Sequence, residues 1–85
     1  MSRIEESLNK AFGETLRTAR GEASISQEEL AVRSGLHRTY VSQLERGQKS
    51  PSLNVIAGLA RSLGVRPHEL VRSAEDLIPS TFPAD

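Results

Sequence analysis

Apolar side chains recur at helical spacing near the start of this chain and again in its second half. Within residues 5–23 they are separated by steps of three, one, four and three, which is the spacing of one face of an α-helix. Phe12 and Leu16 are expected to be the core anchors of this helix. The apolar positions of residues 5–23 are Leu8, Ala11, Phe12, Leu16 and Ala19.

A second helical pattern covers residues 53–63. Ser52 has the side chain of an N-cap, and Gly64 has the position of a closing residue. Pro67 suits the first position of a further short helix that carries Leu70 and Val71. The apolar positions of the longer pattern are Leu53, Ile56, Leu59, Ala60 and Leu63.

Between these patterns, the chain predicts two short helices, at 27–34 and 38–46, joined by a sharp turn at 35–37. Ser26 and Glu29 have the S-x-x-E spacing of a capping box at the start of the first short helix. Gly47 is expected to end the second one. The chain therefore predicts an all-α fold in which a helix pair occupies the centre of the sequence.

The spacing inside this helix pair is specific. Counted from Gln27, Ala31 is the fifth residue, Gly35 the ninth and Val41 the fifteenth. A small fifth residue lets the second helix cross closely, a glycine at the turn tolerates a positive φ, and Val41 with Leu44 faces the first helix. This is the spacing of a DNA-binding helix-turn-helix.

Length and composition fit one small helical bundle. The chain has 85 residues and only three aromatic side chains. We expect residues 1–78 to form the domain and residues 79–85, which hold two of the four prolines, to form a flexible C-terminal tail.

The composition also favours a cytoplasmic protein. The chain has no cysteine, which excludes a disulfide framework and thiolate metal sites and fits a reducing compartment. It has no apolar run of the roughly 20 residues that a membrane span needs, and its first ten residues lack the apolar stretch of a signal peptide.

Charge is unevenly distributed along a chain whose net charge is zero. Residues 30–68 contain six basic residues and one acid, Glu45, so this part carries +5 and the remainder −5. A polyanion such as DNA responds to the local field rather than to the total. The alternative is a set of scattered surface arginines. The six basic residues are Arg33, Arg38, Arg46, Lys49, Arg61 and Arg66.

No arrangement typical of an enzyme is found. His37 and His68 are 31 positions apart and lack companions at metal-ligand spacing. The chain contains no glycine-rich phosphate loop and no G-x-S-x-G motif. We therefore expect no catalytic activity, no metal and no cofactor.

Five segments in order resemble the phage-repressor and Cro-type (XRE-like) helix-turn-helix regulators, from about Phe12 to Leu70. The segments are FGETLRTAR, SQEELAVRSG, HRTYVSQLERG, PSLNVIAGLARSLGV and PHEL. The resemblance implies a compact five-helix domain that binds operator DNA. Within the family, RTYVSQLERG and the following Pro-Ser-Leu are most similar to the small controller proteins of restriction–modification systems.

The helix at 38–46 is the expected recognition helix. With Val41 and Leu44 turned inward, its opposite face carries side chains suited to reading base edges in the major groove. Family members read bases from the matching places. These candidate base-reading residues are Arg38, Thr39, Ser42 and Gln43.

Phosphate contacts are expected at the edges of the groove. The family residue that matches Gln27 holds a phosphate at a helix N-terminus. The loop after the recognition helix and the Ser52 cap offer a second clamp. His37 is equally consistent with an ordinary exposed histidine, and Tyr40 with a residue that covers the helix flank. The candidate phosphate-binding residues are Gln27, His37, Tyr40, Arg46, Gln48, Lys49 and Ser52.

Arg20 continues the apolar face of its helix one turn after Leu16, and a buried arginine needs a partner. Glu45 is the candidate, and two solvated charges are the alternative that spacing leaves open. In the family that the chain resembles, this pair is common, so the resemblance favours a structural ion pair.

We expect a homodimer on double-stranded DNA, with no membrane and no small-molecule ligand as partner. One recognition helix reads only about half a site, and a twofold axis supplies the other half. The alternative function is an antitoxin-type protein-interaction module that also binds DNA. The expected dimer surface lies within residues 67–78 and consists of Leu70, Val71, Leu77 and Ile78.

Overall fold

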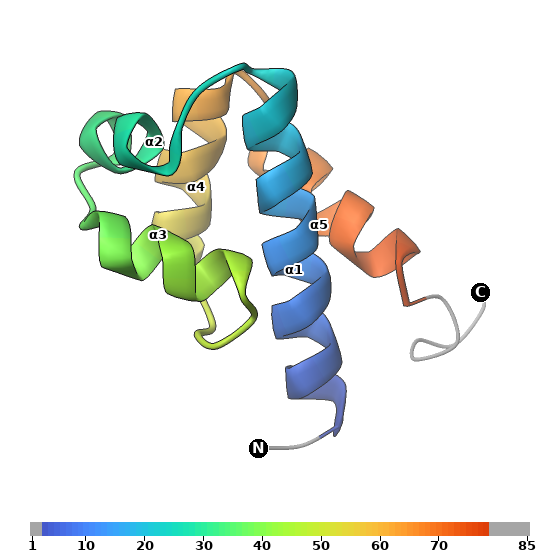
Figure 1. Cartoon of the computed structure of the whole chain (residues 1–85). Coiled ribbons are helices and arrows are strands. Elements are labelled where there is room, and N and C mark those ends of the chain that lie inside the picture. Colours follow the sequence, from blue (N-terminus) through green and yellow to red (C-terminus); the bar gives the residue numbers. More distant parts are fainter. Residues whose placement is uncertain (1–2, 79–85) are drawn as a thin grey trace.

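The computed structural model describes residues 3–78, which form five α-helices (Figure 1). The first and longest helix packs against the third on one side and the fifth on the other. The second and fourth helices complete the bundle, and each contacts the next in the series. The helices are α1 (Arg3–Glu22), α2 (Gln27–Ser34), α3 (Arg38–Glu45), α4 (Leu53–Leu63) and α5 (Pro67–Asp76).

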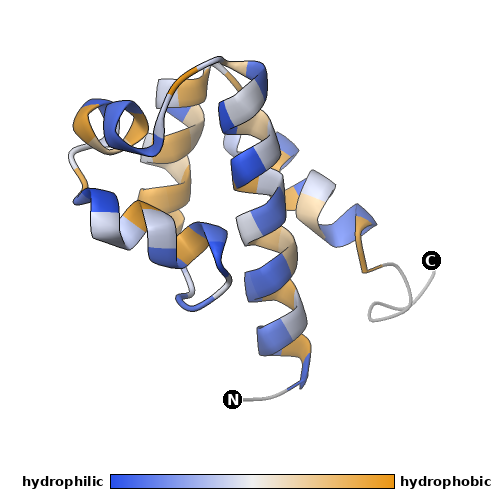
Figure 2. Ribbon diagram, viewed as in Figure 1, coloured by the Kyte–Doolittle hydropathy of each residue, from blue (hydrophilic) through white to orange (hydrophobic). Residues whose placement is uncertain are grey.

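The core lies where the apolar faces of the five helices meet. Phe12 and Leu16, the expected anchors of α1, are both buried, as are Val41 and Leu44 of α3. Figure 2 shows α1 with a largely hydrophilic face toward the viewer, while α4, to its left and behind α3, is mostly hydrophobic. The buried apolar side chains are Ala11, Phe12, Leu16, Leu30, Ala31, Val41, Leu44, Leu59, Ala60, Leu70 and Ala74.

The helix bounds differ little from those the pattern predicts. α2 has the predicted limits, α1 begins two residues earlier, and α3 ends at Glu45 instead of 46. The predicted capping box of α2 forms only in part. Ser26 Oγ accepts a hydrogen bond from the Glu29 backbone N–H at 3.0 Å, but the Glu29 carboxylate pairs with Arg33 at 2.8 Å.

Leu53 is a correction to the predicted apolar face of α4. This residue is 83% exposed, whereas Leu59 and Ala60 are buried. Leu53 is the first residue of the helix, directly after the Ser52 cap, so it precedes the turns that cross the core. The helical period was correct, and only its first member lies beyond the neighbouring helices.

The predicted dimer surface on α5 is wrong for Leu70, and its other three residues do not lie together. Leu70 is 3% exposed and belongs to the core of its own protomer, because its side of α5 faces the bundle. Val71 and Leu77 are exposed, but they are six positions apart, which places them about 120° from each other around the helix axis. Ile78 is half-buried against the core. The four residues do not form one patch.

The expectation of a flexible tail at 79–85 concerns residues outside the described range. Within residues 3–78, no helix is both long enough and apolar enough to cross a membrane.

Candidate nucleic-acid interface

The turn between α2 and α3 fixes how the recognition helix is presented. Gly35 has φ +67°, in the left-handed region that favours glycine. The backbone N–H of Leu36 donates to the Ala31 carbonyl at 2.9 Å, so the turn is tied to the last turns of α2. Ala31 is 2% exposed, as expected for the small residue beneath a close helix crossing.

The two faces of α3 have opposite roles. Val41 and Leu44 are fully buried and mark the side of the helix that faces the core. Arg38 and Thr39 are exposed at the start of the helix, and Ser42 and Gln43 are half-buried one turn later. The four candidate base-reading residues therefore lie away from the buried side of α3, and their contact with DNA stays a prediction.

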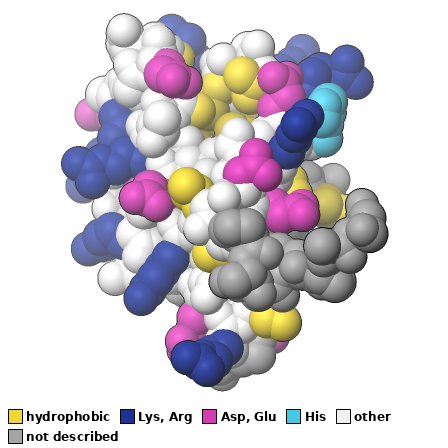
Figure 3. All heavy atoms as spheres, turned by 90° about the vertical axis from the view of Figure 1, so that its right-hand side faces the viewer, with side chains coloured by type: hydrophobic (Ala, Val, Ile, Leu, Met, Phe, Trp, Pro, Cys, Tyr) yellow, Lys and Arg dark blue, Asp and Glu magenta, His cyan; other side chains and the backbone are white. Residues whose placement is uncertain are grey.

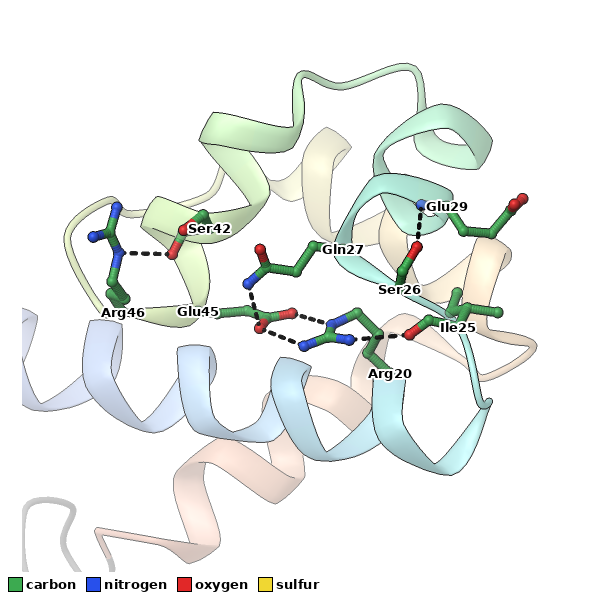
Figure 4. Close-up of polar contacts among 8 residues, drawn as sticks. All are labelled: Arg20, Ile25, Ser26, Gln27, Glu29, Ser42, Glu45 and Arg46. Atoms are coloured by element: carbon green, nitrogen blue, oxygen red, sulfur yellow. Dashed lines mark hydrogen bonds and ion pairs between the residues drawn. The ribbon is translucent and has the colours of Figure 1, made fainter.

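Arg20 and Glu45 form the ion pair that sequence reasoning left open. Arg20 Nε donates to Glu45 Oε2 at 2.6 Å and a second guanidinium nitrogen donates to Oε1 at 3.0 Å, so the pair is bidentate (Figure 4). The Glu45 side chain is only 4% exposed. The hydrogen bonds that Arg20 donates to Glu45 raise the pKa of Arg20 above its ordinary value, and the negative charge of Glu45 adds to this, although partial burial opposes it.

Two further hydrogen bonds extend this pair to α2. Gln27 Nε2 donates to Glu45 Oε1 at 3.0 Å, and Arg20 donates to the Ile25 carbonyl at 3.0 Å. Figure 4 shows Gln27 reaching Glu45 from α2 while Arg20 approaches from α1. Three helices thus meet at one carboxylate. Gln27 keeps one amide hydrogen for another acceptor, so a phosphate contact is compatible with its place here.

A close approach of backbones holds α3 against α1. A Cβ added to Gly13 would lie 2.4 Å from the Leu44 carbonyl oxygen and 2.6 Å from that of Glu45. Glycine is a weak helix former, so helix propensity does not explain its presence in the interior of α1. Its role is steric, because the last turn of α3 occupies the space that a side chain would need.

The segment after α3 forms an exposed edge beside the recognition helix. Arg46, Gln48 and Lys49 are exposed, and Arg46 folds back so that its Nε donates to the Ser42 carbonyl at 3.4 Å. Ser52 Oγ accepts from the Val55 backbone N–H at 3.1 Å and caps α4. Its hydroxyl hydrogen remains available to an anion at the N-terminus of α4.

The last two candidates differ in position. His37 is exposed at the N-cap of α3, without a side-chain cap hydrogen bond. Tyr40 is half-buried and packs against the core. This position fits the alternative interpretation, in which Tyr40 covers the flank of the helix.

Burial of Glu45 changes the charge of this surface. It is the only acid in residues 30–68, and Arg20, which lies outside that stretch, binds it directly. The Glu45 charge is therefore removed from the surface, and basic residues dominate what this part of the chain exposes. The sequence could suggest this pair but could not show the geometry that neutralises the carboxylate.

The fold, the glycine turn and the exposed face of α3 together define a helix-turn-helix protein. The helix-turn-helix family model matches residues 16–70, and the chain belongs to this family of XRE-type DNA-binding transcriptional regulators. The family is regulatory rather than enzymatic.

Individual relatives agree with this assignment. Control protein C.BamHI of Bacillus amyloliquefaciens is 43% identical over 61 residues, which cover 71% of this chain and 75% of the relative. The solved restriction-modification controller protein C.AhdI from Aeromonas hydrophila has 47% identity and a TM-score of 0.72, covering 73% of this chain and 94% of its own. The clp gene regulator ClgR from Corynebacterium glutamicum has 30% identity and a TM-score of 0.82, covering 87% and 79%.

Proposed function

We propose that this regulator acts in the cytoplasm and binds a palindromic operator as a homodimer, with α3 of each protomer in the major groove. The observation that carries this proposal is the division of α3 into a buried face, Val41 and Leu44, and an outer face that begins with exposed Arg38 and Thr39. The buried network at Glu45 holds this helix at a fixed position, so its outer face is a preorganised reading surface.

Each outer side chain has a suitable target on a base edge. The guanidinium of Arg38 matches O6 and N7 of guanine, and the amide of Gln43 matches N6 and N7 of adenine. Thr39 offers a methyl group to thymine and a hydroxyl to a base or phosphate. Ser42 lies between them and is half-buried. Each good bidentate contact discriminates against the wrong base by about 1–3 kcal/mol.

Phosphates are held on both sides of the reading surface. Gln27 and the N-terminus of α2 take one strand, while exposed Lys49 and Arg46 with the capped N-terminus of α4 take the other. His37 and the hydroxyl of Tyr40 remain candidate contacts at the start of α3. Phosphate contacts fix the register of the protein on DNA and carry no sequence information directly.

A dimer places two recognition helices on successive turns of one DNA face, about 34–36 Å apart. The surface that we propose for it is the flank of α5 that carries Val71, 43% exposed. Leu70 is excluded because it is buried, and Leu77 lies on the other flank. The similarity to two control proteins supports a role as a restriction–modification controller.

The proposal is tested by selecting bound fragments from random duplex DNA with the purified chain. We expect an enriched sequence with inverted half-sites one helical turn apart, and binding that weakens as salt rises. Failure to retain any duplex at low ionic strength contradicts the proposal. A single, unrepeated half-site would leave DNA binding intact but contradict the homodimer on a palindrome.

Arg38→Ala should weaken binding to the selected duplex and relax the preference at one base position of each half-site, because a bidentate base contact is lost. Lys49→Ala is the matched comparison. It should weaken binding to selected and random duplexes alike and lower the salt slope by about 1. Fluorescence anisotropy titrations on both duplexes measure the two effects. If the two variants gave the same pattern, the assignment of Arg38 to bases and Lys49 to phosphate would be wrong.

Val71→Glu should shift the protein toward a monomer, because it places a carboxylate within the proposed dimer surface. Sedimentation velocity at several protein concentrations measures this shift. Val32→Glu is the control, since Val32 is 72% exposed and lies on α2. Equal effects of the two substitutions, or no effect of Val71→Glu on a wild-type dimer, would exclude this flank of α5.

One feature favours the second candidate function, a protein-interaction module. A hollow of about 500 Å³ lies between α1 and α5 and is lined by apolar Leu70 and Leu77 and by acidic Glu14, Glu22 and Glu69, among others. Figure 3 looks onto the side of the molecule that carries α5 and shows acidic side chains spread among apolar ones. A basic, partly apolar segment of a partner protein fits this chemistry. A stable stoichiometric complex in which charge reversal at Glu14 and Glu22 weakens binding would support this function.

A further inference from the structure

Lys10 of α1 lies directly against the loop that follows the recognition helix. A Cβ added to Gly47 would lie 2.9 Å from Lys10 Cα, 2.9 Å from its Cγ and 3.2 Å from its backbone nitrogen. The loop backbone therefore touches the main chain and the first methylenes of Lys10. Figure 1 shows the same arrangement, with the loop after α3 beside the lower half of α1.

This contact places the base of the Lys10 side chain against the loop. Lys10 is exposed, and within residues 3–78 it forms no ion pair. Its α-carbon belongs to a 20-residue helix, and its side chain touches the loop as far as Cγ, so the ammonium group can reach the residues beside Gly47. Glu6 and Glu14 lie on the same face of α1, one turn before and one turn after Lys10. Both are exposed, and neither forms an ion pair with it.

Two more cations come from the loop itself. Arg46 and Lys49 flank Gly47 within three residues and are exposed. The acid that precedes them, Glu45, is bound to Arg20 and does not offset their charge. Lys10, Arg46 and Lys49 thus bring three positively charged residues from two distant segments of the sequence to the region around Gly47.

We propose that Lys10 forms a further phosphate-binding site together with this loop, so that α1 holds the DNA strand that passes over residues 46–49. The ligand is a phosphodiester of the DNA backbone. The inference rests on the proposed DNA binding. It adds a phosphate contact from α1 to those already proposed at the N-termini of α2 and α4. The restrained stem lowers the entropy lost when the ammonium group meets a phosphate.

The test compares Lys10→Gln with the wild type on the duplex selected by the wild-type protein. Loss of one phosphate contact lowers the slope of log affinity against log salt by about 0.9. Between about 50 and about 200 mM salt, the wild type should therefore lose about 3.5-fold more affinity than the variant. The preferred base sequence should not change. Lys10→Arg, which keeps both the charge and the packed stem, should bind as the wild type does.

Arg61→Gln is the matched control, because it removes one exposed positive charge from the far end of α4. Its salt slope should equal that of the wild type. A second measurement replaces single phosphodiesters of the duplex by neutral methylphosphonates. At the phosphate that Lys10 contacts, the replacement should weaken DNA binding by the wild type. It should not weaken binding by Lys10→Gln further, since that variant already lacks the same contact.

The outcomes separate the two proposals. If the wild type binds the duplex and Lys10→Gln keeps the wild-type slope, the α1 site is absent and the proposed function stands. A slope lowered equally by Arg61→Gln also overturns the site, because the effect would then be one of overall charge. If the wild type binds no duplex, the proposed function itself fails.

Discussion

Replacement of Glu45 by alanine is expected to destabilise the domain by about 3–5 kcal/mol, because it leaves Arg20 in a partly buried position without its partner. Gln27 also loses its acceptor, so the link from α2 to α3 is broken. A small domain has only about 5–15 kcal/mol of total stability. The variant should therefore be largely unfolded at temperatures that leave the wild type intact.

Urea unfolding followed by circular dichroism measures this loss, and Arg33→Ala is its control. Arg33 pairs with Glu29 at 2.8 Å, but both side chains are about half exposed, so that pair should contribute no more than about 0.5 kcal/mol. Equal losses in the two variants would show that burial of Glu45 contributes nothing to the pair.

The pH dependence of the Arg20 contribution has a definite sign. Glu45 holds the pKa of Arg20 above its ordinary value, so the guanidinium is more basic in the folded state. The associated stability is fully present below the ordinary pKa of arginine and is lost only as pH rises through the higher, folded value. The contribution of Arg20 to the free energy of unfolding should therefore be constant across the neutral pH range.

Local sequence patterns predicted most of the fold because each helix is defined by near neighbours. The apolar period located α1 and α4, while Ser26, Ser52 and Gly35 marked helix ends through side-chain hydrogen bonds and a positive φ. The outer face of α3 followed from the same reasoning, since residues opposite Val41 and Leu44 must point away from the core.

Contacts between distant segments were harder to predict. Leu70 was assigned to a dimer surface, but its own chain buries it. An apolar side chain predicts burial and does not tell whether the same chain or a second copy covers it. Lys10 drew no attention, because its place beside Gly47 depends on how α1 crosses the loop 37 residues later. The Arg20–Glu45 pair was left open by spacing and favoured only by family resemblance.

Gly13 gives the sharpest example of such a distant contact, and Gly13→Ala should disrupt the domain although alanine is the better helix former. The new methyl group would lie 2.4 Å from the Leu44 carbonyl oxygen and 2.6 Å from that of Glu45. These are backbone atoms, so α3 must move as a unit. We expect a loss of about 3 kcal/mol, at the upper end of ordinary overpacking.

Gly58→Ala is the matched control in the interior of α4. A Cβ there meets nothing within 4 Å, so the same substitution should stabilise the protein by up to about 1 kcal/mol. If Gly13→Ala lowers and Gly58→Ala raises the midpoint temperature of thermal unfolding, Gly13 is needed for the crossing of α1 and α3. The displaced recognition helix should also weaken DNA binding by Gly13→Ala under conditions where it remains folded. A Gly13→Ala protein as stable as the wild type would mean that the two helices can separate at no cost, and the fixed presentation of α3 would then need another explanation.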